Sequence, residues 1–241
     1  MDLAGRLARL LIGLVLFGVS LALMVRANLG LGPWDVLHQG IAGRLGWPLG
    51  TVTIAVSALV LLAWIPLRQR PGVGTVANVV IVGLAVDATL AVLPAPDLLA
   101  ARIGILVAGI VLNAVASGLY IGAGLGPGPR DGLMTGLAAR GVSVRLARTV
   151  IEVGALLLGI ALGGTAGVGT VAYALAIGPL VQLALRGRPT SSGVGKRPTT
   201  PRTRTARTLT TRTPPAPTPQ APTPLAPTPL ARTITTEGTQ P

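Results

Sequence analysis

The stretch LGLGPWDVLHQG at Leu29–Gly40 returns in altered form as LGPGPRDGLMTG at Leu125–Gly136. Over the 18 positions that start at Ala27, ten residues recur 96 positions later. The hexapeptide GVGTVA at residues 72–77 then returns unchanged at residues 167–172, 95 positions later. Two matches in the same order with nearly the same offset indicate a duplicated unit of about 95 residues.

The composition is typical of a membrane protein. Hydrophobic residues make up 50% of the 241 residues, and the mean hydropathy is +0.69. Charged residues make up 11%, less than half of the roughly 25% that is usual in soluble domains. The chain has no cysteine, which excludes disulfide bonds, thiol catalysis and cysteine-ligated metals. We therefore expect an all-α integral membrane protein.

Six apolar runs approach the roughly 20 residues with which a helix crosses about 30 Å of hydrocarbon. We expect spans at Leu7–Val25, Leu49–Leu67, Val76–Leu93, Ile103–Ile121, Thr149–Gly167 and Gly169–Leu185. The first run follows Arg6 and Arg9, as the apolar region of a signal peptide would. A matching apolar run occurs within the chain at Ile103–Ile121, so we expect the first run to be a membrane span and not a cleaved signal peptide.

Each copy of the unit contains three of these spans, repeat one at about residues 7–94 and repeat two at about residues 102–185. An odd number of crossings inserts the second copy upside down relative to the first. This arrangement is the inverted-topology repeat of many transporters. The sequence thus predicts a six-helix membrane domain over residues 1–185, made of two inverted three-helix repeats.

The distribution of basic residues predicts the orientation. If the N-terminus is cytoplasmic, the outer loops contain only Arg26, Arg44 and Arg102, and the other basic residues lie on the inner side. Cytoplasmic loops are enriched in Lys and Arg, so we expect both termini in the cytoplasm. The same orientation predicts aromatic side chains at the two interfaces, Trp34 and Trp47 outside and Trp64 and Tyr120 inside.

From about Arg186 the chain is rich in Thr, Pro and Arg, and the tetrapeptide APTP recurs every five residues from Ala216. Nine of the 20 Lys and Arg residues lie after residue 185, opposed there by Glu237 alone. Such a segment cannot form a core. We expect residues 186–241 to be a disordered basic cytoplasmic tail, either a solvated spacer or a contact for anionic lipids. It has no aromatic residue to stack on bases, so we expect no nucleic acid.

The repeated motif LGxGPxD predicts a sharp break followed by a short helix. Its glycines permit unusual backbone paths, its proline suits a first helical turn, and the macrodipole stabilises an aspartate there. The helices that follow are too short to span, so the loops are either capped interfacial turns or re-entrant elements of a solute or ion pathway. The candidate residues are Gly30, Gly32, Pro33 and Asp35 in the first copy and Gly126, Gly128, Pro129 and Asp131 in the second.

The GVGTVA repeats superficially match the G-x-G-x-x-A phosphate-binding pattern, but that pattern requires a preceding strand and a βαβ unit. Arg-Gln-Arg-Pro precedes one copy and a glycine-rich turn precedes the other. We instead expect Thr75 and Thr170 to be the N-caps of the third and sixth spans. Their small neighbours would allow close helix packing.

Few polar residues lie within the predicted spans. Asp87 lies 11 residues after Val76, about 16 Å deep at 1.5 Å per residue, and Asn113 lies ten residues into the next span. An intramembrane acid is a functional candidate by default; alternatively, a neutral Asp87 hydrogen-bonds to Asn113 and joins two helices. Glu152 lies one turn from Arg148, where an interfacial ion pair is favoured over a transport role.

The stretches ANLGLGPWDVLHQG, GLGPGPRDG and GVGT resemble the YczE/YitT-like bacterial membrane proteins, particularly the YczE branch. The resemblance covers roughly residues 5–185 and leaves the tail outside. It implies a multi-pass protein of the bacterial inner membrane. It supplies no substrate and no catalytic residue.

No catalytic constellation, zinc motif or Walker lysine occurs in the sequence, so we expect neither an enzyme nor a cofactor or metal site. The leading interpretation is a protein of the bacterial cytoplasmic membrane that translocates a small solute or ion. The alternative is a non-transporting scaffold or regulator of a partner complex. A transporter should gather Asp87, Asn113 and the motif loops around one cavity, whereas a scaffold should have an apolar interior.

Overall fold

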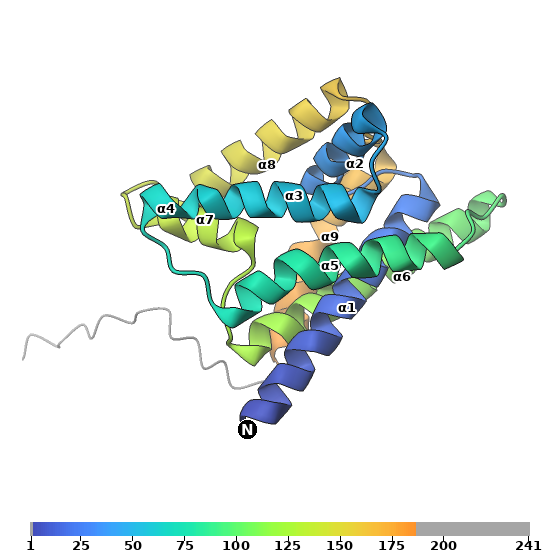
Figure 1. Cartoon of the computed structure of the whole chain (residues 1–241). Coiled ribbons are helices and arrows are strands. Elements are labelled where there is room, and N and C mark those ends of the chain that lie inside the picture. Colours follow the sequence, from blue (N-terminus) through green and yellow to red (C-terminus); the bar gives the residue numbers. More distant parts are fainter. Residues whose placement is uncertain (1, 187–241) are drawn as a thin grey trace, which may run out of the picture. The chain divides into compact units, whose positions relative to one another are not determined.

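The computed structural model describes residues 2–186, so the predicted tail from residue 187 onward lies outside the described residues. Within this range the fold is entirely helical (Figure 1). Its helices are α1 (Leu3–Ala27), α2 (Pro33–Leu45), α3 (Leu49–Leu62), α4 (Trp64–Leu67), α5 (Val73–Val92), α6 (Leu99–Ala123), α7 (Pro129–Ala138), α8 (Val144–Ala161) and α9 (Val168–Arg186).

Five segments of the described chain are long and apolar enough to cross a membrane: α1, α3 with α4, α5, α6 and the first 18 residues of α9. They agree with five of the six predicted spans. The remaining prediction, Thr149–Gly167, is a helix with different bounds. That helix, α8, begins earlier because Ser143 accepts a hydrogen bond from the Leu146 N–H, and it ends before Gly163, whose φ is 93°.

Helices α1 and α6 pack along each other at the centre of the fold, α5 packs on α1, and α9 packs on α6 (Figure 1). Two glycines that are 96 positions apart let the central pair approach closely. A Cβ at Gly13 would lie 2.8 Å from Tyr120 N, and one at Gly109 would lie 2.8 Å from Met24 Cγ. Larger side chains at either position would force the helices apart.

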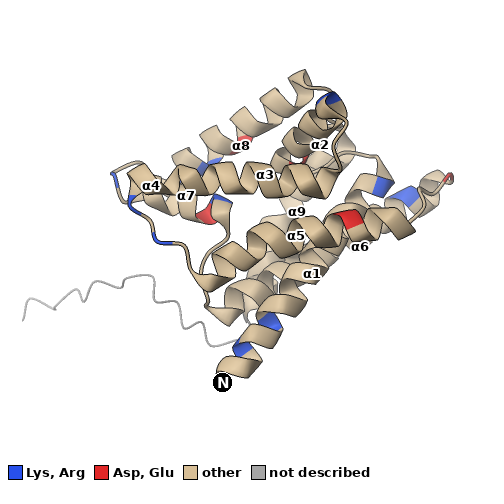
Figure 2. Cartoon of the chain, viewed as in Figure 1, with Lys and Arg blue, Asp and Glu red and all other residues tan. Residues whose placement is uncertain are grey.

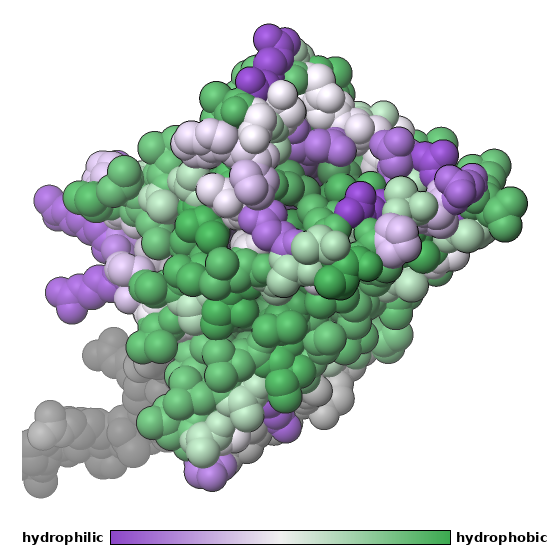
Figure 3. Space-filling model, turned by 45° about the vertical axis from the view of Figure 1, so that its right-hand side comes forward, coloured by the Kyte–Doolittle hydropathy of each residue, from purple (hydrophilic) through white to green (hydrophobic). Residues whose placement is uncertain are grey.

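The outer helix faces expose large apolar side chains, such as Leu59, Leu157 and Leu175, which are between 62% and 73% exposed. In Figure 3 a continuous hydrophobic surface covers much of this face, and hydrophilic residues gather toward its margins. Figure 2 shows most charged residues near helix ends and in loops. Such a surface is suited to lipid rather than to water.

The structure corrects two of the predicted interfacial aromatic residues. Trp64 is 2% exposed and donates a hydrogen bond of 3.0 Å from Nε1 to the Pro129 carbonyl. Tyr120 is 7% exposed and lies in the core. Trp47, by contrast, is 52% exposed. The prediction for Trp64 and Tyr120 was wrong because both side chains pack against the second motif instead of lipid headgroups.

Residues at matching positions of the two repeats make reciprocal contacts. Arg6 donates to the carbonyl oxygens of Ala123 and Gly124 at the end of α6, at 2.9 and 2.7 Å. Arg102, 96 positions later, donates to those of Ala27 and Asn28 at the end of α1, each at 2.7 Å. Arg44 and Arg140 form a second such pair, donating to the ends of α8 and α4. Each repeat therefore satisfies helix ends of the other.

Candidate functional site

Both copies of the motif form the predicted break and short helix. Gly30 and Gly126 adopt φ of 117° and 131°, a region that side chains disfavour. Gly32 and Gly128 are the N-caps of α2 and α7, and each following proline is the first helical residue. Asp35 and Asp131 lie in the first helical turns, as predicted.

Each motif loop lies against the start of a long helix from the other repeat. The Gly74 N–H at the start of α5 donates to the Leu125 carbonyl at 2.9 Å. The Gly169 N–H at the start of α9 donates to the Leu29 carbonyl at 2.8 Å. The two loops are thus fixed by equivalent, crossed hydrogen bonds.

The predicted N-cap roles of Thr75 and Thr170 were wrong by three positions. The N-cap of α5 is Gly72, and Thr75 is the third residue of the helix. Its hydroxyl accepts from the Gly72 N–H at 3.2 Å and donates to the Pro127 carbonyl at 2.7 Å. Thr170 accepts from the Gly167 N–H at the same distance. A threonine at the third helical position can accept a hydrogen bond from the N-cap N–H, as in a capping box. The sequence therefore signalled a helix start, but the start lies three residues before the position that was predicted.

A cavity of about 500 Å³ lies between the two motif loops. Six of the eight motif residues line it, all but Gly30 and Gly126. Its remaining polar lining comes from α3, α5, α6, α7, α8 and α9: Thr53, Ser57, Asn78, Asn113, Ser117, Tyr120, Arg130, Arg148, Glu152, Tyr173 and Gln182. The predicted gathering of the motif loops and Asn113 around one cavity is therefore observed, and Asp87 is missing from it.

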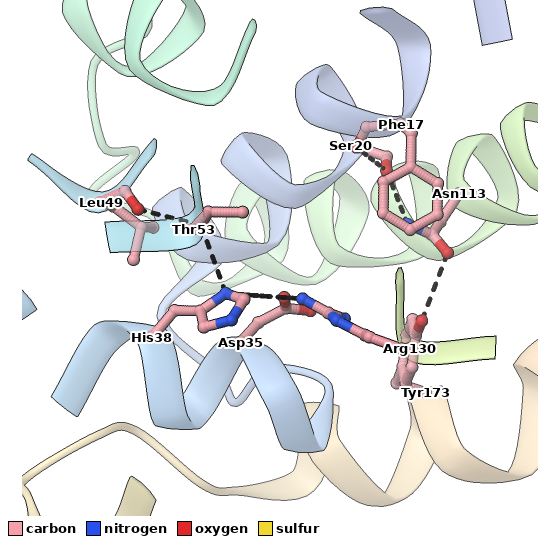
Figure 4. Close-up of polar contacts among 9 residues, drawn as sticks. All are labelled: Phe17, Ser20, Asp35, His38, Leu49, Thr53, Asn113, Arg130 and Tyr173. Atoms are coloured by element: carbon pink, nitrogen blue, oxygen red, sulfur yellow. Dashed lines mark hydrogen bonds and ion pairs between the residues drawn. The ribbon is translucent and has the colours of Figure 1, made fainter. Parts of the chain in front are cut away.

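The centre of the cavity contains an ion pair between the repeats. Arg130 Nη2 lies 3.3 Å from Asp35 Oδ1, and Asp35 is 4% exposed (Figure 4). The Arg130 guanidinium also lies 5.1 Å from the centroid of the Trp34 ring, within the range of a cation–π interaction. Trp34 and Arg130 occupy the same position of the motif, 96 residues apart. The buried Trp34 Nε1 has no hydrogen-bond partner among the described residues, so it can donate to a bound solute.

His38 adjoins this ion pair from the next turn of α2. It is 1% exposed, and its Nδ1 lies 3.2 Å from Thr53 Oγ1 and 3.7 Å from Asp35 Oδ1. Burial and the nearby Arg130 both lower the pKa of His38 well below its ordinary value. Burial raises the pKa of Asp35, while Arg130 opposes that rise. We infer a neutral His38 imidazole beside the contact of Asp35 with Arg130 near neutral pH.

A chain of hydrogen bonds across three helices lies beside the ion pair. Asn113 on α6 donates to Ser20 Oγ on α1 at 2.9 Å and accepts from the Tyr173 hydroxyl on α9 at 3.3 Å (Figure 4). Beside it the Tyr120 hydroxyl donates to Asp131 Oδ2 at 3.0 Å. The polar side chains of this chain of hydrogen bonds are therefore paired, and the bond between Asn113 and Ser20 joins the two repeats.

The predicted pairing of Asp87 with Asn113 was wrong. Asp87 Oδ1 accepts from the Gly50 N–H at 2.6 Å, and Oδ2 accepts from the Thr51 N–H at 3.0 Å. These donors lie in the first turn of α3, where an anion is stabilised by unsatisfied N–H groups and the helix dipole. The depth count failed because α5 extends from Val73 to Val92, so Asp87 lies near its end rather than at its middle.

Glu152 forms the predicted ion pair with Arg148, at 2.9 Å between Oε1 and Nε. Both side chains also line the cavity, which the sequence interpretation did not anticipate. It likewise missed the roles of Trp34, His38 and Arg130. A usable signal was present in the repeat alignment: Trp34 and Arg130 differ at equivalent positions of an otherwise matching motif, and the structure brings these two side chains together.

Comparison with known proteins gives a family but no activity. The model of the family of unknown function DUF6198 matches residues 4–186. The chain belongs to this family. An uncharacterized protein of Haemophilus influenzae is 39% identical over 177 residues, covering 73% of this chain and 81% of that protein. The uncharacterized membrane protein YczE of Bacillus subtilis is 33% identical over 171 residues, covering 70% and 79%. No solved structure matches.

The resemblance to the YczE branch is therefore confirmed. Together with the five apolar helices, it makes the chain an integral membrane protein of a family whose function is uncharacterised. The family match spans both copies of the motif and the whole of the described cavity. It ends where the basic tail begins.

Proposed function

We propose that this protein translocates a small polar solute or ion across the bacterial cytoplasmic membrane, through the cavity between its two motif loops. The observation that carries the proposal is the central group of Asp35, Arg130 and Asp131, which lines a cavity of about 500 Å³ inside an otherwise apolar helical protein. Charged groups at membrane depth are expensive and typically mark ion or substrate pathways. A scaffold needs no such cavity.

The inverted repeat is part of this proposal. Arg6 bonds to Ala123 and the matched Arg102 bonds to Ala27. Gly74 bonds to Leu125 and the matched Gly169 bonds to Leu29. These reciprocal bonds support a two-fold relation between the repeats. In this arrangement α8 is the remaining crossing. Its 18 residues extend about 27 Å at 1.5 Å per residue, close to the thickness of the hydrocarbon core. Both termini then lie in the cytoplasm, as the basic residues indicate.

Two matched positions test the inversion. Gly43 in α2 and Ala139 after α7 are 96 residues apart, and neither is buried. We expect Gly43→Cys to react with a membrane-impermeant maleimide from outside intact cells, and Ala139→Cys to react only after the cells are opened. The chain has no native cysteine to interfere. Reaction of both from the same side would overturn the inverted topology.

Transport itself is tested in proteoliposomes with a panel of isotopically labelled alkali and divalent cations, inorganic anions, amino acids and monosaccharides. We expect uptake of at least one class, and we expect Arg130→Gln and Asp35→Asn each to reduce it at least tenfold while the protein remains folded. Asp97→Asn, an exposed loop residue outside the cavity, is the control. No uptake of any class by wild-type protein would favour the scaffold alternative.

A further inference from the structure

The two repeats pack one pair of matched helices differently. In the first repeat, α3 packs against α5: a Cβ at Gly83 would lie 2.5 Å from Gly50 O and 2.4 Å from Ile54 Cγ1. In the second repeat, the equivalent helices α8 and α9 make no comparable packing contact. Gly178, 95 positions after Gly83, has no heavy atom outside its own helix within 4 Å of a built Cβ.

The uncovered face of α9 forms a wall of the cavity. Ala174, Ile177, Gly178, Val181 and Gln182 line the cavity at helical spacing. The matched face of α5 is covered instead, with Gly83 buried and Asp87 bonded to the first turn of α3. The cavity therefore extends between α8 and α9, whereas the matched helices α3 and α5 are packed together and leave no such space.

Both outer helices are held at their C-terminal ends by the motif helix of the other repeat. After α3, Trp64 packs on Gly132 of α7, where a Cβ would lie 1.9 Å from Trp64 Cζ2. At the end of α8, a Cβ at Gly159 would lie 2.5 Å from Leu37 N of α2. Trp64 and Gly159 are 95 positions apart. The repeats differ at the N-terminal ends of these helices, where α3 is docked on α5 and α8 is not docked on α9.

We infer that α8 pivots about its contact with α2 and docks its N-terminal half on the Gly178 face of α9, closing the cavity on that side. The matching motion releases α3 from Gly83 of α5 and opens the cavity on the other side of the membrane. This inference rests on the proposed transport function, for which an inverted repeat supplies two equivalent gates around one fixed site. The central pair of Asp35 and Arg130 stays in place in both states.

Sequence differences explain why the α8 gate is the open one here. Arg145 takes the place of Gly50, so α8 cannot approach α9 as closely as α3 approaches α5. Gln182 takes the place of Asp87, so α9 offers a neutral group where α5 offers a carboxylate to the helix N-terminus. The closed contact of α8 is thus weaker than that of α3.

The inference is tested by pulsed electron paramagnetic resonance distances between spin labels on introduced cysteines, in lipid nanodiscs without added solute. One pair is Val150→Cys with Leu175→Cys, on exposed positions of α8 and α9. The matched pair, 95 positions earlier, is Ala55→Cys with Val80→Cys on α3 and α5. We expect the α8–α9 pair to show two distances, the shorter of which approaches the main distance of the matched pair but exceeds it, because Arg145 stands where α3 has Gly50.

Gly178→Leu is expected to remove the shorter α8–α9 distance, because the leucine fills the docking face. Its control is Gly154→Leu on α8, where a Cβ also meets no atom within 4 Å and which does not line the cavity; this variant should keep both distances. Asp87→Ala, which weakens the α3 dock, is expected to increase the shorter α8–α9 population.

A single long α8–α9 distance in wild-type protein and in Asp87→Ala would overturn the gate. So would a shorter distance that survives Gly178→Leu. These distances need no solute, so solute uptake combined with a single distance would reject the gate and leave the transport proposal intact. Two distances without any uptake would support the gate and count against transport.

Discussion

In the first repeat the motif reads GPWD, with a histidine three residues later at His38, and in the second it reads GPRD, with Met134 at the matched position. The shared residues build the same break and helix start in both copies. The residues that differ meet at the centre of the cavity, where Arg130 contacts Trp34 and Asp35. Two arginines at this position would place like charges side by side. The two copies therefore share the residues that form the break and the helix start, and they differ at Trp34 and Arg130, which face each other in the cavity.

The largest expected difference between the repeats is at their matched glycines. Gly83→Leu should destabilise the protein by at least about 3 kcal/mol or prevent folding, because the side chain meets the α3 backbone. Gly178→Leu should change stability by less than about 1 kcal/mol, since its surroundings are open. Melting temperatures of both variants in detergent check this. Equal losses at the two positions would show that α9 is covered as α5 is.

The next effect concerns the contacts that hold the outer helices at their C-terminal ends. Trp64→Ala should cost about 3–5 kcal/mol, because it leaves a cavity against Gly132 and removes the bond to the Pro129 carbonyl. Val36→Ala, which shortens the side chain packed on Gly164 beside the matched contact, should cost about 2 kcal/mol.

Trp64→Phe is an intermediate change at this contact. It keeps an aromatic ring but loses the N–H donor and part of the indole that packs on Gly132, so a loss of about 1–3 kcal/mol, smaller than that of Trp64→Ala, is expected. Thermal unfolding of Trp64→Ala, Val36→Ala and Trp64→Phe in detergent ranks their losses of stability. A Trp64→Ala protein as stable as wild type would contradict the holding role assigned to this residue.

A smaller effect is expected where Asp87 and Gln182 differ. Asp87→Leu removes the acceptor for the first turn of α3 and should cost about 1–2 kcal/mol. Asp87→Asn keeps an acceptor oxygen, so its loss of stability should be only a few tenths of the loss expected for Asp87→Leu. Gln182→Leu should be nearly neutral. Because Asp87 does not line the cavity, Asp87→Asn should also retain solute uptake; a folded variant that has lost uptake would return Asp87 to the pathway.

The smallest effect is expected for the tail, which belongs to neither repeat. Both repeats lie within residues 2–186, and the family match ends at residue 186. Deletion after Arg188 should leave the melting temperature in detergent unchanged within about 2 °C, since no helix of either repeat is shortened. Failure of the truncated protein to insert, or a lost melting transition, would show that the fold of the membrane domain requires the tail.

The sequence predicted the elements better than their contacts. Hydropathy and length located five spans, and the motif chemistry predicted that Pro33 and Pro129 would begin short helices. The bounds of α8 were missed because its first turns carry Arg145 and Arg148, which hide a helix start within an apparent loop. Hydropathy indicates that a helix is buried, but it does not tell whether lipid or protein covers each face.

Side-chain partners were beyond the reach of spacing alone. Counting residues placed Asp87 at the depth of Asn113, but depth does not tell which face of a helix a side chain occupies. Asp87 instead bonds to α3, and Asn113 bonds to Ser20 and Tyr173. The ion pair of Asp35 with Arg130 joins residues 95 positions apart, and only the packing of the two repeats brings them together.

The crossed contacts of Arg6 and Arg102 impose an order on the synthesis of the protein. The chain emerges from its N-terminus, so Arg6 enters the membrane region 117 residues before its partner Ala123. The end of α1 must likewise wait 75 residues until Arg102 reaches Ala27. During that interval α1 carries Arg6 without its partner carbonyl groups, and the carbonyl groups at its own C-terminal end lack Arg102. Insertion of the first half is thus completed only by arrival of the second, and a ribosome that stalls midway leaves a half whose helix ends remain unpaired.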